Sequence, residues 1–140
     1  MHNEITCEWK GEMQFEGHVH GHSIMLDDIH PDGTPSVGPT PKRLLLLSAA
    51  GCTGMDVIPM LKKMQVPIEG LTIKVEAEGT DTHPKIYTSM KIIYTFSGND
   101  IESYRSKIEH AVTLSQEKYC GVSAMLRMVM PIEIIINLHG

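Results

Sequence analysis

The sequence predicts an α+β fold in a single domain that spans residues 1–140. Two observations favour this fold class. Short runs in which apolar and polar residues alternate, as they do in half-buried strands, occur in groups, and stretches with helical periodicity separate these groups. No internal repeat, low-complexity tract or interdomain linker divides the 140 residues, and a chain of this length buries a substantial core.

Three short strands are expected at the beginning of the chain. Ile5, Cys7 and Trp9 alternate with polar residues, which predicts a half-buried strand whose Cys7 side chain faces inward as a small apolar group. Residues 13–19 and 23–26 predict the second and third strands, with a short connection between them.

Three histidines spaced two apart, His18, His20 and His22, would share one face of a strand. Neutral imidazoles at close quarters bind zinc or copper, so a metal site is one interpretation. A solvated strand face or a hairpin end is the other. We favour it because Gly21 loosens the strand and no cysteine or carboxylate lies at ligand spacing. We therefore predict no bound metal.

A loop and a long buried helix come next. Residues 27–38 are dense in proline, glycine and aspartate, which predicts a loop, and a long loop before a buried helix often carries function. Thr40 is a suitable N-cap, and Leu44–Leu47 are apolar on every side, which predicts a helix buried in the core. The helix should reach Lys63, and Pro59 should kink it or end its first segment.

Hydropathy and charge disfavour membrane and nucleic-acid partners. The apolar run Leu44–Ile58 is shorter than the about 20 residues that a bilayer requires, and Asp56 interrupts it. The net charge of −5 and the lack of a basic stripe argue against nucleic-acid binding. The first residues lack the basic and apolar regions of a signal peptide, so we expect a cytoplasmic location.

The second half of the chain predicts a hairpin, two helices and a final strand. Residues 71–77 and 87–96 alternate as strands do, and residues 79–85 read as the connection between them. An amphipathic helix is expected over residues 99–118, and a strongly apolar strand over residues 132–138.

The amphipathic helix should begin with a capping box. Asn99 or Asp100 is a suitable N-cap, and Glu102 lies three residues after Asn99. A second, shorter helix is expected from Cys120 to Met128.

The three cysteines lie too far apart for a disulfide framework or a CxxC metal motif. Cys52 lies in the crowded apolar helix and needs a polar partner to ionise. Cys120 lies at a helix start, where N–H groups and the helix dipole favour a thiolate, and Arg127 follows seven residues later on the same face. A thiolate that attacks a peroxide becomes a sulfenic acid, which a nearby second thiol converts to a disulfide. Periodicity alone predicts two buried cysteines and does not select this chemistry.

Two cysteine contexts carry a family resemblance. The segments GPTPKRLLLLSAAGCTGMDV, around Cys52, and EKYCGVSAML, around Cys120, resemble the OsmC/Ohr family of osmotically inducible and organic hydroperoxide resistance proteins. The order of expected elements is similar across nearly the whole chain, and Gly21, His22 and Asp27 resemble the GH…D pattern of the OsmC-like subgroup. The resemblance implies an intertwined homodimer, in which antiparallel sheets wrap around buried central helices and the active sites lie at the subunit interface.

The resemblance also implies a function. Cys52 would attack an organic hydroperoxide and Cys120 would resolve the product to a disulfide, as a defence against oxidative or osmotic stress. A dithiol such as a lipoylated protein would reduce the disulfide, and no cofactor is implied. Met55, Met125 and Leu126 are candidates for an apolar substrate pocket, with ordinary core packing as the alternative.

Two features depart from the family pattern. Peroxidase members use an arginine from the N-terminal part and a glutamate just before the buried helix. This chain has no arginine before Arg43, and it has Lys42-Arg43 near the expected glutamate. Arg43 or His22 could support the Cys52 thiolate instead, with a solvent-facing or structural role as the alternative for each. A second functional hypothesis is therefore a non-catalytic, stress-linked dimer that binds a small apolar ligand or senses oxidants through a reversible disulfide.

Overall fold

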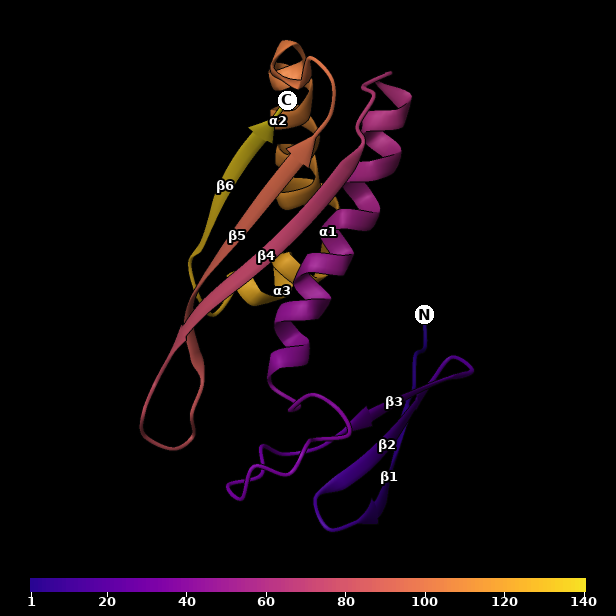
Figure 1. The fold of residues 1–140 in the computed structure, drawn as a ribbon, viewed down its shortest axis with the longest axis vertical. Helices are drawn as coiled ribbons and strands as arrows, with labels where there is room; N and C mark the ends of the chain where they lie inside the picture. Colours follow the sequence, from indigo (N-terminus) through magenta and orange to yellow (C-terminus); the bar gives the residue numbers. More distant parts are fainter. The chain divides into compact units, whose positions relative to one another are not determined.

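The computed structural model describes residues 1–140, which form two compact units, Met1–Leu45 and Leu46–Gly140 (Figure 1). Each unit contains one three-stranded sheet, with strand orders β1-β2-β3 and β4-β5-β6. The mixture of two small sheets with helices confirms the predicted α+β class. The single-domain organisation stays a prediction.

The first unit is a three-stranded antiparallel meander. It consists of β1 (Thr6–Gly11), β2 (Gln14–Val19) and β3 (His22–Leu26), which correspond to the three predicted strands. His20 and Gly21 both have positive φ angles, 49° and 78°, as the two central residues of a tight hairpin turn require. This turn separates β2 from β3.

Cys7 is exposed, as is most of β1. The prediction that its side chain faces an apolar interior was therefore wrong for the single chain. The reason lies in the composition of the first unit, which contains strands and a loop but no second layer of secondary structure to cover a face of the sheet.

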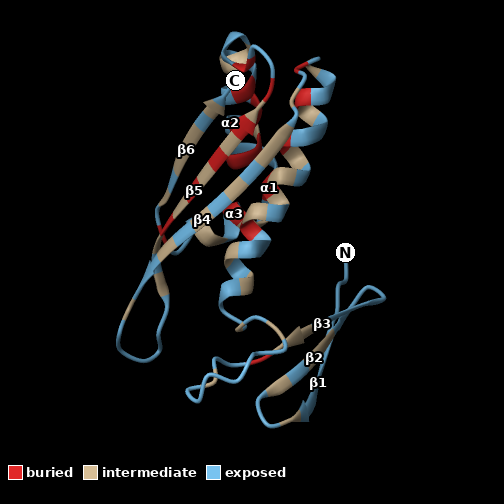
Figure 2. Ribbon diagram, in the orientation of Figure 1, coloured by how far each residue is buried: buried red, intermediate tan, exposed pale blue.

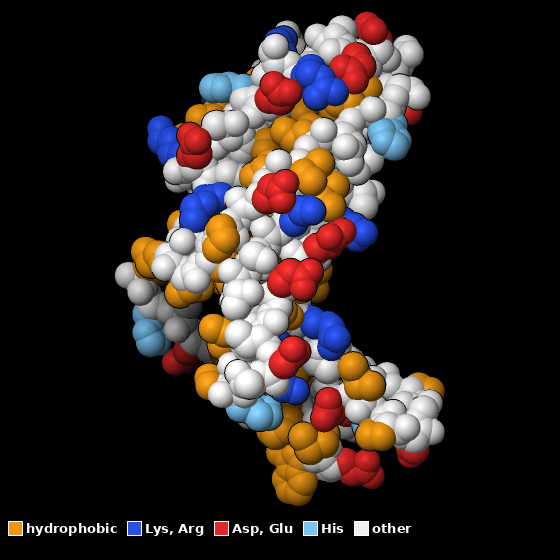
Figure 3. Space-filling model, turned by 90° about the vertical axis from the view of Figure 1, so that its left-hand side faces the viewer, with side chains coloured by type: hydrophobic (Ala, Val, Ile, Leu, Met, Phe, Trp, Pro, Cys, Tyr) orange, Lys and Arg blue, Asp and Glu red, His pale blue; other side chains and the backbone are white.

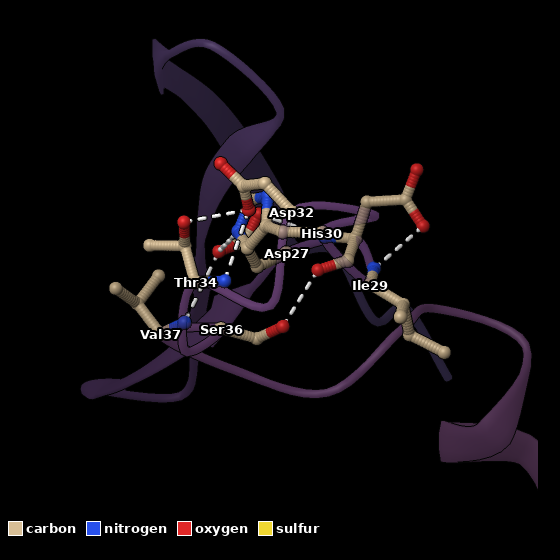
Figure 4. A network of polar contacts seen from close by, with 8 residues as sticks. Asp27, Ile29, His30, Asp32, Thr34, Ser36 and Val37 are labelled. Atoms are coloured by element: carbon tan, nitrogen blue, oxygen red, sulfur yellow. Dashed lines mark hydrogen bonds and ion pairs between the residues drawn. The ribbon is translucent and has the colours of Figure 1, made fainter.

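The predicted loop after β3 is ordered around a buried carboxylate, Asp27 (Figure 4). Asp27 Oδ1 accepts a hydrogen bond from the Asp28 backbone N–H at 2.7 Å. Its Oδ2 accepts one from the Val37 backbone N–H at 3.1 Å and lies 3.0 Å from Nε2 of His30. The Asp27 N–H donates to the Pro39 carbonyl, so one aspartate fixes both ends of the loop.

The hydrogen bonds of Asp27 and His30 shift both pKa values in the directions of an ion pair. The backbone N–H of Val37 is the largest influence that lowers the pKa of Asp27. The hydrogen bond to Asp27 is the largest influence that raises the pKa of His30 above its usual 6.5. Protonated His30 therefore stabilises the folded loop fully below pH 6.5, and this contribution is lost as the pH rises through the raised pKa of the folded state.

We expect an Asp27→Asn substitution to return the pKa of His30 towards its usual range, because the hydrogen-bonding carboxylate is then gone. The measurement is an NMR titration of the His30 imidazole in both proteins. Asp28→Asn is the matched control, because the Asp28 carboxylate accepts from the Ile29 N–H and not from His30. Equal His30 titrations in the Asp27 variant and the wild type would contradict this account.

The sheet of the second unit is mixed. The antiparallel hairpin of β4 (Gly70–Gly79) and β5 (Tyr87–Ser97) was predicted. The last strand, β6 (Ile132–His139), runs parallel to β5, whereas the resemblance implied antiparallel sheets. Parallel neighbours need a crossover connection, and the helices between β5 and β6 provide it.

The connection between β5 and β6 is a chain of short helical segments. A 3-10 turn, η1 (Ile101–Tyr104), leads into α2 (Arg105–Leu114), a π-helical turn η2 (Ser115–Tyr119) and α3 (Gly121–Arg127). The periodicity correctly predicted the amphipathic α2 and the separate α3. The capping box was wrong, because Asp100 adopts a left-handed conformation with no side-chain cap. Glu102 instead accepts two hydrogen bonds from the guanidinium of Arg105, at 2.9 and 3.0 Å.

The core of the second unit lies where α1 (Arg43–Lys63) and α2 pack on one face of the sheet. The buried residues of α1 recur every four positions, and those of β5 every second position, so each element presents one face. Figure 2 shows this buried zone along β5 and the neighbouring helices. The fully buried positions of the two faces are Ala49, Thr53, Val57, Ile92, Tyr94 and Phe96.

The opposite face of α1 is exposed in the single chain, so the predicted burial on every side holds for one side only. Leu47 and Met55 are 65% and 80% exposed. Figure 3 shows another face, the left-hand side of Figure 1, where hydrophobic side chains also reach the surface between charged ones. The helix continues through Pro59 to Lys63, so the proline does not end it.

With 21 residues, α1 is long and apolar enough to cross a membrane by length and composition alone. The prediction of an apolar stretch shorter than a bilayer requires was therefore wrong. An apolar core helix meets the same criterion, and α1 packs on the sheet through the buried face described above.

Candidate functional site: a paired-cysteine centre

The structure brings Cys52 of α1 and Cys120, the residue before α3, together inside the second unit. The two thiols are free, and they lie close enough for Cys120 to raise the pKa of the Cys52 thiol. Cys120 is 2% exposed, whereas Cys52 is partly exposed. Cys52 is thus the more exposed of the two residues.

Backbone N–H groups of the first turn of α3 meet both sulfurs. Cys120 lies at the start of α3, as predicted, where it is the N-cap, and its Sγ accepts a hydrogen bond from the Ser123 N–H at 3.4 Å. The Cys52 thiol interacts with the N–H of Val122, one residue earlier. Orphan N–H groups at a helix start are natural partners for an acceptor with negative charge.

The surroundings of Cys52 favour the neutral thiol. Burial is the largest influence and raises its pKa, and the neighbouring Cys120 and Asp56 act in the same direction. The hydrogen bond from the Val122 backbone opposes them and lowers the pKa. A nucleophilic Cys52 therefore needs a group that accepts its proton.

A chain of buried polar side chains runs beside the cysteine pair. The Thr53 hydroxyl lies 2.7 Å from Tyr94 Oη and 2.7 Å from Ser115 Oγ. Ser115 Oγ donates to Asp56 Oδ2 at 2.9 Å. On the other side, Gln116 Nε2 donates to Tyr94 Oη at 2.7 Å. Burial raises the pKa of Tyr94, although its hydrogen bonds with Thr53 and Gln116 act to lower it.

Arg127, a predicted supporting residue, lies at the far end of this chain. Its guanidinium donates to the Gln116 carbonyl oxygen at 2.8 Å and to Gln116 Oε1 at 3.0 Å. Arg127 thus binds the polar chain through Gln116 and does not hydrogen-bond either thiol.

The other two basic candidates lie in the first unit. Arg43 donates to the Thr40 hydroxyl at 2.7 Å, at the start of α1. His22 is exposed at the start of β3, with the His20 ring centroid 6.3 Å away. Their support of Cys52 stays a prediction.

The three residues predicted to line a substrate pocket differ in their surroundings. Met55 borders an open groove of about 940 Å³ between α1 and the start of β4. Met125 is 62% exposed on α3, and Leu126 packs against the core. Small α1 residues form part of the groove wall, which includes Ala50, Gly51, Gly54, Ile58 and Leu71.

The predicted histidine face does not form. His20 lies in the hairpin turn, which breaks the strand alternation between His18 and His22. A different group, Glu8, Glu16 and His18, comes together on β1 and β2.

Lys10 already approaches both of these glutamates, at 3.3 Å from Glu8 and 3.9 Å from Glu16. This exposed cluster is therefore explained by its own ion pairs and needs no metal.

Comparison with known proteins identifies the family of this chain. The sequence profile described as OsmC-like protein matches residues 32–135, which is most of the chain. The chain belongs to the OsmC-like family. The matched region includes both cysteines and all of the buried polar chain.

Individual OsmC-like relatives cover nearly the whole chain. Protein YhfA of Escherichia coli K12 is 29% identical over 130 residues, 92% of each chain. A crystal structure of a hypothetical protein from Aquifex aeolicus VF5 has a TM-score of 0.84 at 28% identity, covering 99% of this chain and 97% of that one.

A crystal structure from Legionella pneumophila, described as an organic hydroperoxide resistance protein OsmC, has a TM-score of 0.65 at 13% identity. It covers 98% of this chain and 97% of that one. At this identity the similarity establishes the OsmC-like fold alone.

Sequence reasoning missed the buried polar chain of this OsmC-like protein. One signal was available, because Ser115 falls on the apolar face of the predicted amphipathic helix, where a polar residue needs a partner. Tyr94 gave no signal, because tyrosine is an ordinary residue on the inward face of a strand.

Proposed function

We propose that this protein is a cysteine-based thiol peroxidase that reduces organic hydroperoxides. The observation that carries the proposal is the contact of the partly exposed Cys52 with the buried Cys120 beside the N–H groups of α3. A peroxidatic sulfur must meet the substrate, and a resolving sulfur must lie close enough to form a disulfide with it.

The reaction would take two steps. Cys52 Sγ, after loss of its proton, attacks the terminal peroxide oxygen, so that the O–O bond breaks, the peroxide is reduced to an alcohol, and sulfur is oxidised to a sulfenic acid. The Cys120 thiol then attacks the sulfenic sulfur, which releases water and forms the Cys52–Cys120 disulfide. Two thiols thus supply the two electrons that the peroxide accepts.

Family membership supports this chemistry at a coarser level. The OsmC/Ohr family includes peroxiredoxin-like enzymes, and some of its structures are named for organic hydroperoxide resistance. We further propose a cytoplasmic location, where a dithiol such as a lipoylated protein returns the disulfide to two thiols.

We expect one equivalent of cumene hydroperoxide to convert the reduced protein to a Cys52–Cys120 disulfide within seconds, faster than one equivalent of H₂O₂ does. Free-thiol counting and peptide mapping by mass spectrometry measure both. Cys52→Ser removes the nucleophile and should abolish peroxide consumption. Cys7→Ser is the control and should react as the wild type does, because Cys7 lies on the first sheet. Unreacted thiols in the wild type would favour the non-catalytic, ligand-binding hypothesis instead.

The role of Cys120 has a separate test. In a Cys120→Ser variant, the Cys52 sulfenic acid has no partner thiol, so excess peroxide should convert it to sulfinic and sulfonic acids. Intact-mass analysis detects the added oxygen atoms. A variant that stops at one oxygen, or gains none while the wild type reacts, would contradict the assignment of Cys120 as the resolving residue.

We also propose that the protein acts as a homodimer, the typical state of OsmC/Ohr proteins. The exposed face of α1 supports this. Its apolar groove is bordered by Gly51 and Gly54, whose lack of side chains allows another backbone to approach closely. Large hydrophobic residues beside the groove, Met55 and Ile58, are exposed in the single chain.

Substitution of Gly51 provides a test of the dimer. A Cβ atom at Gly51 meets nothing within 4 Å, so a larger side chain fits the single chain. We expect Gly51→Glu to raise the dimer dissociation constant at least about a hundredfold, because the interface would bury an unpaired charge. Light scattering at micromolar concentration measures this. Gly51→Ala is the control and should remain dimeric, whereas a monomeric wild type would refute the proposal.

A further inference from the structure

The hydrogens of the buried polar chain have only one consistent assignment. The single hydroxyl hydrogen of Ser115 goes to Asp56 Oδ2, so Thr53 must donate to Ser115. The hydrogen of Thr53 is then used, so Tyr94 must donate to Thr53. Gln116 Nε2 donates to the Tyr94 oxygen. Every bond therefore points towards Asp56.

Charged groups fix this direction at both ends. Arg127 donates to Gln116 Oε1, which turns the Gln116 amide so that Nε2 faces Tyr94. At the other end, the Asp56 carboxylate is an acceptor only. A reversed bond anywhere in the chain would leave a buried hydroxyl hydrogen without an acceptor, which is costly. The chain thus holds Asp56 in one orientation.

Asp56 lies beside the proposed nucleophile. It follows Cys52 by four residues on α1, so the two side chains share one face of the helix. Its negative charge acts on the Cys52 thiol, although burial acts more strongly. Ser115 engages only Oδ2 of the carboxylate, so the Oδ1 atom is left for a second partner.

We propose that Asp56 is the proton acceptor for the Cys52 thiol, and that Ser115, Thr53, Tyr94, Gln116 and Arg127 are positioning residues that orient it. This inference rests on the proposed peroxidase function and specifies how its nucleophile is generated. It gives Cys52 a proton acceptor on its own helix, whereas Arg127 is hydrogen-bonded to Gln116.

The protons balance over the reaction of Cys52 with the hydroperoxide. The Cys52 S–H bond breaks and its proton moves to the Asp56 carboxylate. The thiolate takes the terminal oxygen of the hydroperoxide, and the O–O bond breaks to leave an alkoxide. The alkoxide takes the proton back from Asp56 and leaves as the alcohol, so Asp56 returns to its starting state and sulfur ends as the sulfenic acid.

The experiment compares Asp56→Asn with the wild type in two assays. The first is the pH dependence of Cys52 alkylation by iodoacetamide, read peptide by peptide, which needs no peroxide. Loss of the neighbouring charge should lower its midpoint by roughly 0.5–1 unit. The second is the rate of Cys52 oxidation by cumene hydroperoxide at pH 7, which should fall at least about tenfold because the proton acceptor is gone.

Opposite changes in the two assays are the signature of a proton acceptor, since Cys52 forms its thiolate more readily and yet reacts more slowly with peroxide. An unchanged alkylation midpoint would overturn the inference, because Asp56 would then not act on the thiol. A lowered midpoint with undiminished oxidation would overturn it as well. Asp100→Asn makes the same chemical change at an exposed turn and should alter neither assay.

The positioning residues are tested by Tyr94→Phe, which keeps the aromatic packing and removes the hydroxyl that links Gln116 to Thr53. Oxidation of Cys52 should slow several-fold while the alkylation midpoint stays that of the wild type, because the Asp56 charge is retained. Tyr104→Phe is the matched control on η1. Equal oxidation rates in Tyr94→Phe and the wild type would refute the positioning role.

Failure of the two proposals can be told apart. If peroxide does not oxidise the thiols of the wild type, the peroxidase function is refuted. The alkylation assay still reports whether Asp56 acts on Cys52. If Asp56→Asn does not fold by circular dichroism, Ser115→Ala replaces it. That variant keeps the carboxylate but frees it from its donor, so peroxide oxidation should slow with the alkylation midpoint retained, and an unchanged oxidation rate would overturn the inference.

Discussion

The packing of the helices on the sheet in the second unit depends on the hydrogen bonds of Thr53. This fully buried hydroxyl on α1 contacts Tyr94 on β5 and Ser115 on η2, so a single side chain connects the long helix, the sheet and the crossover segment. Apolar contacts alone would allow α1 to slide or rotate over the sheet, since they are not directional. Buried polar contacts impose one register, because any other leaves hydroxyl groups unpaired. The position of Cys52, next to Thr53 in the sequence, follows from that register.

The same crossover segment also places the second cysteine, Cys120. The π-helical turn η2 closes with the Cys120 N–H donating to the Ser115 carbonyl oxygen at 2.7 Å, after which the chain leaves the helix and α3 begins. Ser115 thus contributes its side chain to the polar chain and its carbonyl group to the placement of Cys120. The π-helical turn between α2 and α3 therefore places the Cys120 thiol at a helix N-cap beside Cys52.

Periodicity predicted nearly all of the strands and helices, because an element that buries one face has apolar residues at the spacing of that face in its local sequence. The two cysteines were also predicted, from the family resemblance of their contexts. The polar chain was not, because Thr53, Tyr94 and Ser115 come from three separate segments and meet only through tertiary packing. The errors have physical causes as well. Cys7 follows an apolar alternation on a sheet that lacks a covering layer in its own unit, and Asp100 adopts a left-handed backbone in place of a cap.

Activation of a thiol whose pKa is raised requires either a positive charge that stabilises the thiolate or a base that removes the proton. Arg127 is hydrogen-bonded to Gln116, and the negative charge of Asp56 disfavours the thiolate. The residues of this centre therefore do not provide a positive charge for the thiolate. They fit the second requirement, a base, since Asp56 lies one helical turn from Cys52 on the same face of α1 and its carboxylate can receive a proton. The backbone N–H of Val122 then offsets part of the charge that forms on the Cys52 sulfur during attack.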